Sequence, residues 1–250
     1  MKISALVLAG IRPGGDPLAR QQGVSHKGLI EIAGVPMIER VIEALSNAGC
    51  ERIAVATDDE GVTAIARSNT AEIITPGLGP SASAARGLAS LGTPLLITTS
   101  DHALLRPEWV RELIERTPAT ADVGIMLARR DRVEAAEPAS RRTYLKFADG
   151  EWSGCNLFYL RTERARAAID IWQKVEADRK RPWRIAARLG PATLFLMLTR
   201  RLTLAEGIAR LGKRISIEAA LVPATDGLAA IDVDKPADLA LVREFYSSSR

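Results

Sequence analysis

Carboxylates that follow predicted strands are the first residues in this chain with the chemistry of a reaction. Asp101 comes shortly after the apolar run 94–98, and Asp232 and Asp234 stand two residues apart just before the last predicted helix. A carboxylate at the carboxyl end of a buried strand can bind Mg²⁺ that also contacts phosphate oxygens. The alternative is that Asp101 caps the helix that follows it, and that Asp234 or Lys235 caps the last helix.

Two further segments could bind phosphate groups. The loop Leu8-Ala9-Gly10-Ile11-Arg12-Pro13-Gly14-Gly15-Asp16 has three glycines and an arginine, so backbone N–H groups and a guanidinium can approach phosphates. It matches neither GxGxxG nor GxxxxGK[ST], which excludes the dinucleotide fingerprint and the Walker loop. Lys27, in Ser25-His26-Lys27-Gly28-Leu29, could add a point charge to a polyphosphate site. Each segment, taken alone, could equally be ordinary surface.

The composition excludes several classes of protein. The chain has 250 residues, 47% hydrophobic and 26% charged, which is ordinary for a globular protein with a sizeable core. No window approaches the roughly 18 uninterrupted apolar residues of a membrane helix. Two cysteines, Cys50 and Cys155, cannot build a disulfide framework, so we expect a reducing, cytoplasmic location. The N-terminal apolar run stops at Gly10, which favours a buried strand over a signal peptide.

Short apolar runs alternate with helical patterns through the first 130 residues. This alternation is typical of βαβ units, whose parallel sheets bind ligands beyond the carboxyl ends of the strands. We expect one α/β domain over residues 1–250, with a mostly parallel central sheet and a basic helical insertion at about 162–213. The predicted strands are 3–8, 52–57, 72–75, 94–98, 122–128, 143–147, 156–160, 215–217 and 228–233, with a hairpin around Asp149-Gly150. The predicted helices are 37–47, 60–67, 83–90, 108–117, 162–178 and 236–246.

Positive charge is concentrated in one stretch. Residues 179–214 contain ten lysines and arginines and a single acid, Glu206, whereas the net charge of the whole chain is +4. A basic patch favours an anionic partner, and apolar stretches between arginines are typical of a helix on an anionic membrane surface. A lid or a homodimer surface, or a solvated helical face, explains the pattern as well. We expect no nucleic-acid partner, because no aromatic residues alternate with the charges and no nucleic-acid motif is present.

The order of these features resembles the MobA-like nucleotidyltransferases of the glycosyltransferase-A fold, close to the sugar- and inositol-phosphate cytidylyltransferases. The resemblance covers residues 1–160 and 225–245 and leaves the basic stretch outside. The matching elements are Leu8-Ala9-Gly10, Arg12, Lys27 with Gly34-Val35-Pro36, Asp101, Asp232 to Leu239, Gly77 to Ser83 and Ser153-Gly154-Cys155-Asn156.

The resemblance implies a Rossmann-like three-layer sandwich that uses Mg²⁺ or Mn²⁺. The implied reaction moves a nucleoside monophosphate from an NTP, with CTP slightly favoured, onto a sugar, polyol or cyclitol phosphate and releases pyrophosphate. The implied catalytic residues are Lys27, Arg12 and Asp101, and the implied metal ligands are Asp101 with Asp232 or Asp234. The implied nucleotide-binding residues are Leu8, Ala9, Gly10, Gly79, Ser81, Ser83 and Ser100, and Gly154 and Asn156 face the acceptor.

Several alternatives stay open. The Gly14-Gly15 pair comes later than in the family loop, so Arg20 is an alternative to Arg12. A glycosyltransferase that uses a nucleotide-sugar shares the fold, but its Asp-x-Asp motif normally follows a central strand. A non-catalytic nucleotide sensor is the other rival, and the irregular glycine loop favours it. For His26 and His102, which both adjoin proposed site residues, we expect local hydrogen bonding.

Overall fold

Strand β1 (Ser4–Leu8) forms the centre of the main sheet, and all five of its residues are buried. It pairs in parallel with β4 (Arg52–Ala56) on one side and β6 (Leu95–Thr99) on the other. A strand that is covered on both faces has a continuous apolar sequence, and for this reason β1 can be predicted from the sequence. The remaining strands are β5 (Glu72–Ile74), β7 (Val123–Arg129), β8 (Leu145–Phe147), β9 (Gly150–Leu160), β10 (Ala219–Pro223), and β2 (Glu31–Ile32) with β3 (Val35–Pro36) as a separate hairpin.

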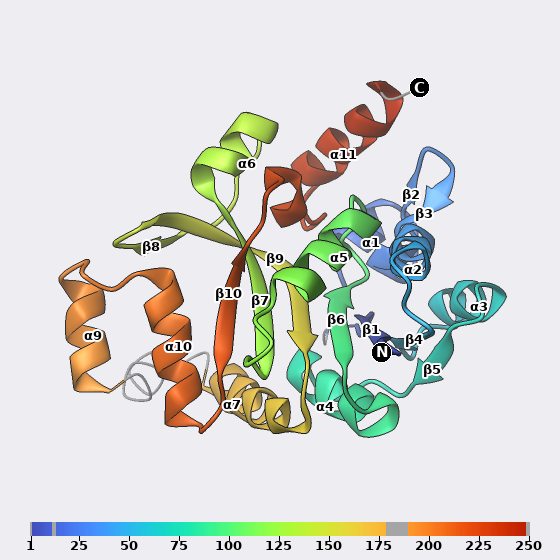
Figure 1. Ribbon diagram of the computed structural model, residues 1–250. Helices are drawn as coiled ribbons and strands as arrows, with labels where there is room; N and C mark the ends of the chain where they lie inside the picture. The colour runs from blue at the N-terminus through green and yellow to red at the C-terminus, as the bar shows by residue number, and fades with distance from the viewer. Residues whose placement is uncertain (1, 12–13, 179–189, 249–250) are drawn as a thin grey trace.

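The computed structural model describes residues 2–11, 14–178 and 190–248. Its main sheet has the order β10-β7-β9-β6-β1-β4-β5, with β8 paired to β9 (Figure 1). β9 runs antiparallel between β6 and β7, and its hairpin with β8 confirms the turn predicted at Asp149-Gly150. The other neighbouring strands of the main sheet are parallel. The predicted mostly parallel sheet is therefore confirmed.

Helices cover both faces of this sheet. The helices are α1 (Pro17–Gln21), α2 (Met37–Asn47), α3 (Glu60–Ser68), α4 (Pro80–Leu91), α5 (Pro107–Arg116), α6 (Arg130–Ala136), α7 (Arg166–Ala177), α9 (Pro191–Leu198), α10 (Leu204–Arg214) and α11 (Pro236–Ser248). α2, α3 and α5 pack with Ala5 and Val7 on one face of β1, whereas α4 and α7 pack with Leu6 and Leu8 on the other. Because successive side chains of a strand point to opposite faces, this split produces the predicted three-layer sandwich.

The helical arm, residues 190–214, contains α9 and α10 and lies beyond the edge strand β10. α10 packs against β10, and Leu204 joins Leu127 and Trp152 in a small apolar cluster. Residues 179–189, which the sequence analysis placed in the basic insertion, lie outside the described residues. Within the described ranges, no helix is both long and apolar enough to cross a membrane.

The two last predicted strands are wrong. Residues 215–217 follow the end of α10, and Ser216 has a left-handed φ of 60°, so β10 begins only at Ala219. Within residues 228–233, Gly227–Ala230 form a 3₁₀ helix, which begins where the Asp226 carboxylate accepts a hydrogen bond from the Leu228 amide at 2.9 Å. Residues 228–233 are all buried, whereas in 215–217 only Ile217 is buried and Ser216 is exposed. In such short runs neither apolar character nor burial distinguishes a strand from a turn.

The 3₁₀ helix Gly227–Ala230 leads directly into the aspartate pair and touches α6 so closely that it has no space for a side chain at its first residue. A Cβ added at Gly227 would lie 2.1 Å from the Arg132 carbonyl oxygen and 2.6 Å from the Val133 Cα. Gly227→Ala should therefore lower the free energy of unfolding by about 2 kcal/mol or more, because backbone must shift. Urea unfolding measures it. Gly154→Ala is the control, since its Cβ would meet nothing within 4 Å; equal losses would contradict this packing.

Candidate active site

The candidate site lies where β1 and β6 end side by side. Leu8 is in register with Thr99, and the Ser100 amide donates a hydrogen bond to the Leu8 carbonyl at 3.1 Å. The loops that leave these two strands therefore start at the same edge of the sheet. Parallel α/β sheets bind ligands at this edge.

Lys27 reaches this edge from a short 3₁₀ helix, Lys27–Leu29. The Nδ1 atom of His26 caps the helix by accepting a hydrogen bond from the Gly28 amide at 2.9 Å. A Cβ at Gly28 would lie within 3.3 Å of the Cβ atoms of Ile38 and Ser100, so glycine permits the close approach of this helix to the end of β6. The local hydrogen-bonding role expected for His26 agrees with this cap.

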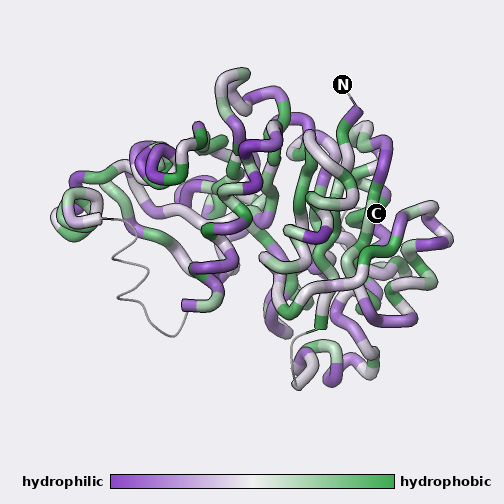
Figure 2. The backbone as a smooth tube through the Cα atoms, turned by 90° about the horizontal axis from the view of Figure 1, so that it is seen from below, coloured by the Kyte–Doolittle hydropathy of each residue, from purple (hydrophilic) through white to green (hydrophobic). Residues whose placement is uncertain are grey.

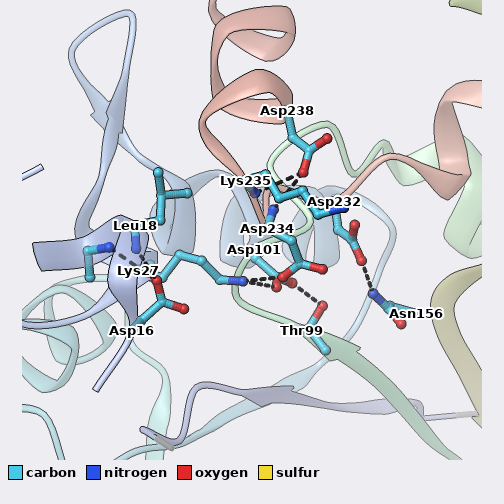
Figure 3. A network of polar contacts seen from close by, with 12 residues as sticks. Asp16, Leu18, Lys27, Thr99, Asp101, Asn156, Asp232, Asp234, Lys235 and Asp238 are labelled. Atoms are coloured by element: carbon cyan, nitrogen blue, oxygen red, sulfur yellow. Dashed lines mark hydrogen bonds and ion pairs between the residues drawn. The ribbon is translucent and has the colours of Figure 1, made fainter. Parts of the chain in front are cut away.

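The Lys27 ammonium lies between two carboxylates that come from distant parts of the chain (Figure 3). Its Nζ is 2.7 Å from Oδ2 of Asp101 and 2.6 Å from Oδ1 of Asp234. The Thr99 hydroxyl donates a hydrogen bond to the other Asp101 oxygen. The side chains of Lys27 and Asp101 are only 13% and 14% exposed, whereas that of Asp234 is 52% exposed, so the cluster is open on the Asp234 side.

The charges of this cluster stabilise one another. Burial by itself would lower the pKa of Lys27, but Asp101 and Asp234 outweigh it and raise the pKa above its ordinary value. Burial would raise the pKa of Asp101, but the Lys27 ammonium and the Thr99 hydroxyl together lower it. The contact between Lys27 and Asp101 thus favours the charged form of both groups.

Asp232 belongs to the same edge but has different partners. Its carboxylate forms an ion pair with Arg142 and accepts a hydrogen bond from the Asn156 amide at 2.5 Å. Burial raises the pKa of Asp232, and the negative charges of Asp101 and Asp234 add to this, against the effect of Arg142. Asp232 is therefore a buried carboxylate that is fixed by protein groups, whereas Asp234 faces Lys27.

A β-bulge places Asn156 in this network. The pairing of β7 with β9 shifts register between Ile125 and Leu127, and opposite this shift Asn156 has a left-handed φ of 50°. Asparagine adopts that conformation more readily than most residues, and bulges re-aim side chains next to sites. Figure 3 shows the Asn156 amide turned toward Asp232. A Cβ added at neighbouring Gly154 would meet no atom of the described residues within 4 Å, so Gly154 borders open space at this bulge.

A single backbone hydrogen bond fixes the aspartate pair against β6. The Val233 amide, between the two aspartates, donates to the Asp101 carbonyl at 3.0 Å. Asp238, in the first turn of α11, holds the segment before the helix, because its carboxylate accepts hydrogen bonds from the amides of Asp234 and Lys235 at 3.1 and 2.9 Å. The side chain of Asp234 is left to face the lysine.

The glycine-serine loop before α4 forms a second part of the edge. The Ser83 hydroxyl accepts a hydrogen bond from the Gly77 amide at 2.9 Å and donates to the Gly79 carbonyl at 3.1 Å. Glu176 of α7 accepts a hydrogen bond from the Ser81 amide at 3.1 Å, and another from its hydroxyl. An open pocket of about 600 Å³ adjoins these residues. A carboxylate thus occupies the N-terminus of α4, which favours negative charge.

The structure brings together only part of the predicted set. Lys27, Asp101, Asp232, Asp234 and Asn156 converge in the contacts above, and Ser100 is buried beside them.

The structure does not place the arginine that the sequence analysis assigned to the triphosphate. Arg12 lies outside the described residues. Its alternative, Arg20, donates a hydrogen bond to the Gly14 carbonyl of its own loop. Sequence reasoning missed Thr99, Arg142 and Glu176, because no local motif marks them.

Two carboxylates that share one ammonium are also suited to a divalent cation. Within the described ranges, no three His, Cys, Asp or Glu side chains form a group that could hold a metal by themselves. Mg²⁺ usually needs only one or two carboxylates, with water and substrate phosphates as its other ligands. Asp101 and Asp234 fit this requirement, because both already point at one cationic atom.

The fold is a three-layer α/β sandwich with a lysine–carboxylate cluster at the strand ends, where such sheets bind ligands. The chain belongs to the MobA-like NTP transferase domain family, whose model matches residues 5–195. It is therefore a nucleotidyltransferase, and the family found by resemblance in the sequence is confirmed. The matched region differs from the one expected, because it includes residues 161–195 and does not reach 225–245. No curated protein matches the chain.

Solved structures agree with the family. A protein from Thermus thermophilus described as a hypothetical transferase is 30% identical, with a TM-score of 0.83 over 96% of this chain and 100% of that one. A CMP-2-keto-3-deoxy-manno-octonic acid synthetase complexed with CTP is 20% identical, with a TM-score of 0.61 over the whole of both chains. A 4-diphosphocytidyl-2C-methyl-D-erythritol synthase from Anaerococcus prevotii is 11% identical, with a TM-score of 0.61 over 98% of each chain. The last two share the fold.

If the Lys27 ammonium occupies the position of a divalent metal ion, removal of this side chain should strengthen metal binding. Lys27→Met leaves Asp101 and Asp234 without their counter-charge, so we expect the protein without nucleotide to bind Mn²⁺ about tenfold more tightly than the wild type. Titration calorimetry or electron paramagnetic resonance with Mn²⁺ alone measures the affinity. Lys235→Met, which removes a neighbouring exposed lysine, is the control. An unchanged affinity in Lys27→Met, or a gain that survives the addition of Asp234→Asn, would contradict this interpretation.

His102 should make the metal-free protein acid-sensitive. Burial lowers the pKa of His102 to about 4, from 6.5 for a free histidine, and the ring is stacked on Trp109. A depressed folded-state pKa means that stability is full above pH 6.5 and is lost as the pH falls toward 4. His102→Gln should therefore lose less unfolding free energy between pH 7 and pH 4.5, by about 1–3 kcal/mol. Urea unfolding across this range tests it; parallel curves for the two proteins would refute it.

Proposed function

We propose that this nucleotidyltransferase moves a nucleoside monophosphate from an NTP, preferably CTP, to a phosphorylated small molecule in a reaction that requires Mg²⁺ or Mn²⁺. The observation that carries the proposal is the Lys27 ammonium held by Asp101 and Asp234 where β1 and β6 end. An NTP brings a divalent cation and a negatively charged triphosphate to the same place. The two carboxylates suit the cation, and the ammonium suits the triphosphate.

The transfer needs little acid–base chemistry from the protein. An acceptor phosphate oxygen attacks the α-phosphorus of the NTP, the bond from that phosphorus to the bridging oxygen breaks, and pyrophosphate leaves with the electron pair. The acceptor phosphate is already an anion at neutral pH, so catalysis consists of positioning and charge neutralisation. When bound by Asp101 and Asp234, the metal supplies Lewis-acid neutralisation of phosphate charge.

Each part of the edge has a role in this proposal. Lys27 turns from the two carboxylates to the triphosphate and neutralises charge on the leaving pyrophosphate. The backbone of Leu8, Ala9 and Gly10, which begins at the same edge, lies along the phosphates. Gly79, Ser81 and Ser83 face the base or ribose, as the family resemblance implies.

The acceptor belongs on the side of Asp232. Arg142 and Asn156 hold this buried carboxylate, and both are donors that suit an acceptor with phosphate and hydroxyl groups. Asp232 acts as a positioning residue, because it aligns these two donors. Sugar, polyol and cyclitol phosphates are the acceptor class that we propose. CTP is favoured because a structural relative of the same fold is described as complexed with CTP.

The contacts of the aspartate pair count against a glycosyltransferase. In the Asp-x-Asp element, Asp234 contacts Lys27 while Asp232 contacts Arg142 and Asn156. The two carboxylates thus have separate partners and are not arranged to bind one metal ion together. A nucleotidyltransferase needs only one of them beside Asp101.

Pyrophosphate release tests the reaction and the site together. Each of the four common NTPs should be incubated with Mg²⁺ and a panel of sugar, polyol and cyclitol phosphates, and released pyrophosphate measured by a coupled assay. We expect release that needs one NTP and one acceptor, and that falls at least about a hundredfold in Asp101→Asn because the metal loses a ligand.

The control is Asp131→Asn, which removes a carboxylate whose side chain is 63% exposed and is paired with Arg129 rather than with the Lys27 cluster. Its rate should equal that of the wild type. NTP binding without any release across the panel would favour a sensor, and transfer of sugar from a nucleotide-sugar would favour a glycosyltransferase. Full activity in Asp101→Asn would refute the proposed site.

A further inference from the structure

The tip of the helical arm exposes apolar side chains that no part of the candidate site uses. In α9, Phe195 is 60% exposed, Leu198 is 75% exposed and Met197 is 40% exposed. Phe195 and Leu198 are three residues apart and therefore share one face of the helix. Figure 2 shows this helix at the far end of the arm, well away from the sheet, as a hydrophobic segment. Most large apolar side chains of the described residues are instead buried.

Two arginines directly follow this apolar tip. Arg200 and Arg201 are exposed, and they are the only charged residues in the sequence from 190 to 202. Their place is fixed by the turn that ends the helix, where Arg200 has a left-handed φ of 53°. The Arg200 amide donates to the Met197 carbonyl at 3.1 Å, and the Arg201 amide donates to the Leu196 carbonyl at 2.8 Å. The turn therefore sets two positive charges next to the exposed apolar residues.

The same turn satisfies the polar groups at the end of the helix. The Thr199 amide and hydroxyl both donate to the Phe195 carbonyl, at 2.9 and 2.8 Å. Together with the two arginine amides, these bonds occupy carbonyls that a helix end normally leaves unpaired. Three of the last four carbonyls of α9 are paired in this way, which lowers the cost of placing this helix end in an apolar medium, where each unpaired group costs several kcal/mol.

We infer that the tip of the arm, Phe195 to Arg201, docks on an anionic lipid surface. Exposed apolar side chains with two cations directly beside them, on a helix too short to cross a bilayer, are suited to the interface of an anionic membrane. Anionic headgroups attract each nearby arginine, and the acyl boundary accepts Phe195 and Leu198. Three side chains are a small area beside the roughly 800 Å² that each partner buries in a typical protein interface, which counts against a second copy as the occupant.

The position of the arm leaves the candidate site accessible while the tip is docked. α10 packs on the edge strand β10, and β7 and β9 separate that strand from β6 and β1, where the site lies. The inference rests on the arm alone and stands whether or not the proposed substrates are right. Docking would hold the enzyme at a membrane surface with its strand-end site free for substrates.

Vesicle co-sedimentation with the full chain tests the inference. The wild type should bind vesicles of three parts phosphatidylcholine to one part phosphatidylglycerol at low salt, and should bind pure phosphatidylcholine vesicles much less. Phe195→Ser with Leu198→Ser should weaken binding at least about tenfold, because both side chains lose burial in the lipid. Arg200→Gln with Arg201→Gln should weaken it by about fivefold for each charge, and added salt should mimic this loss.

Leu145→Ser is the matched control, because Leu145 is 51% exposed on β8, outside the tip Phe195 to Arg201; the β8–β9 hairpin contacts the arm at its base, where the Ala148 amide donates to the Leu202 carbonyl. The binding of this variant should equal that of the wild type, and thermal unfolding should confirm that all variants are folded. The absence of binding to anionic vesicles at low salt would overturn the inference, as would equal losses in Leu145→Ser. A wild-type dimer in sedimentation velocity that Phe195→Ser with Leu198→Ser makes monomeric, without vesicle binding, would assign the tip to a second copy instead.

Discussion

The ion pair of one ammonium with two carboxylates is the constraint on which the strand-end edge depends. Lys27, Asp101 and Asp234 come from three distant segments, and each would be costly to bury alone. Their contacts raise the pKa of Lys27 and lower that of Asp101, so the charged forms of these two groups are favoured. In the proposed reaction, the triphosphate and its metal would exchange ionic partners with this cluster, and no charge would need to be newly buried.

The rest of the sheet edge serves to hold this cluster in place. The parallel pairing of β1 with β6 brings the glycine loop beside Asp101, and one backbone bond from Val233 sets both late aspartates against it. The bulge at Asn156 and the ion pair of Arg142 with Asp232 give Asp232 different partners from Asp234. Two carboxylates two residues apart thus acquire different chemistry, one fixed among protein donors and the other directed to a cation.

The helical arm is the part of the described chain that this edge does not explain. It packs on β10 through α10, while α9 presents apolar side chains and two arginines to the outside. The family model ends at residue 195, within α9, so the tip lies at the limit of the matched region. A fold shared among nucleotidyltransferases is thereby combined with a surface of different physical character, which is suited to a lipid interface.

The sequence by itself determined the α/β class, the central strands and the residue types at the strand ends, because the apolar period and the position of Asp101 after a buried run are local properties. It also placed Lys27 and the aspartate pair in one site through their order along the chain. Only the tertiary structure decided that Asp234 and not Asp232 contacts Lys27, that Arg142 pairs with Asp232 and Glu176 with Ser81, and that residues 228–233 form no strand. Those outcomes depend on which groups meet across the fold, and burial among distant elements leaves no periodic signal in a short stretch of sequence.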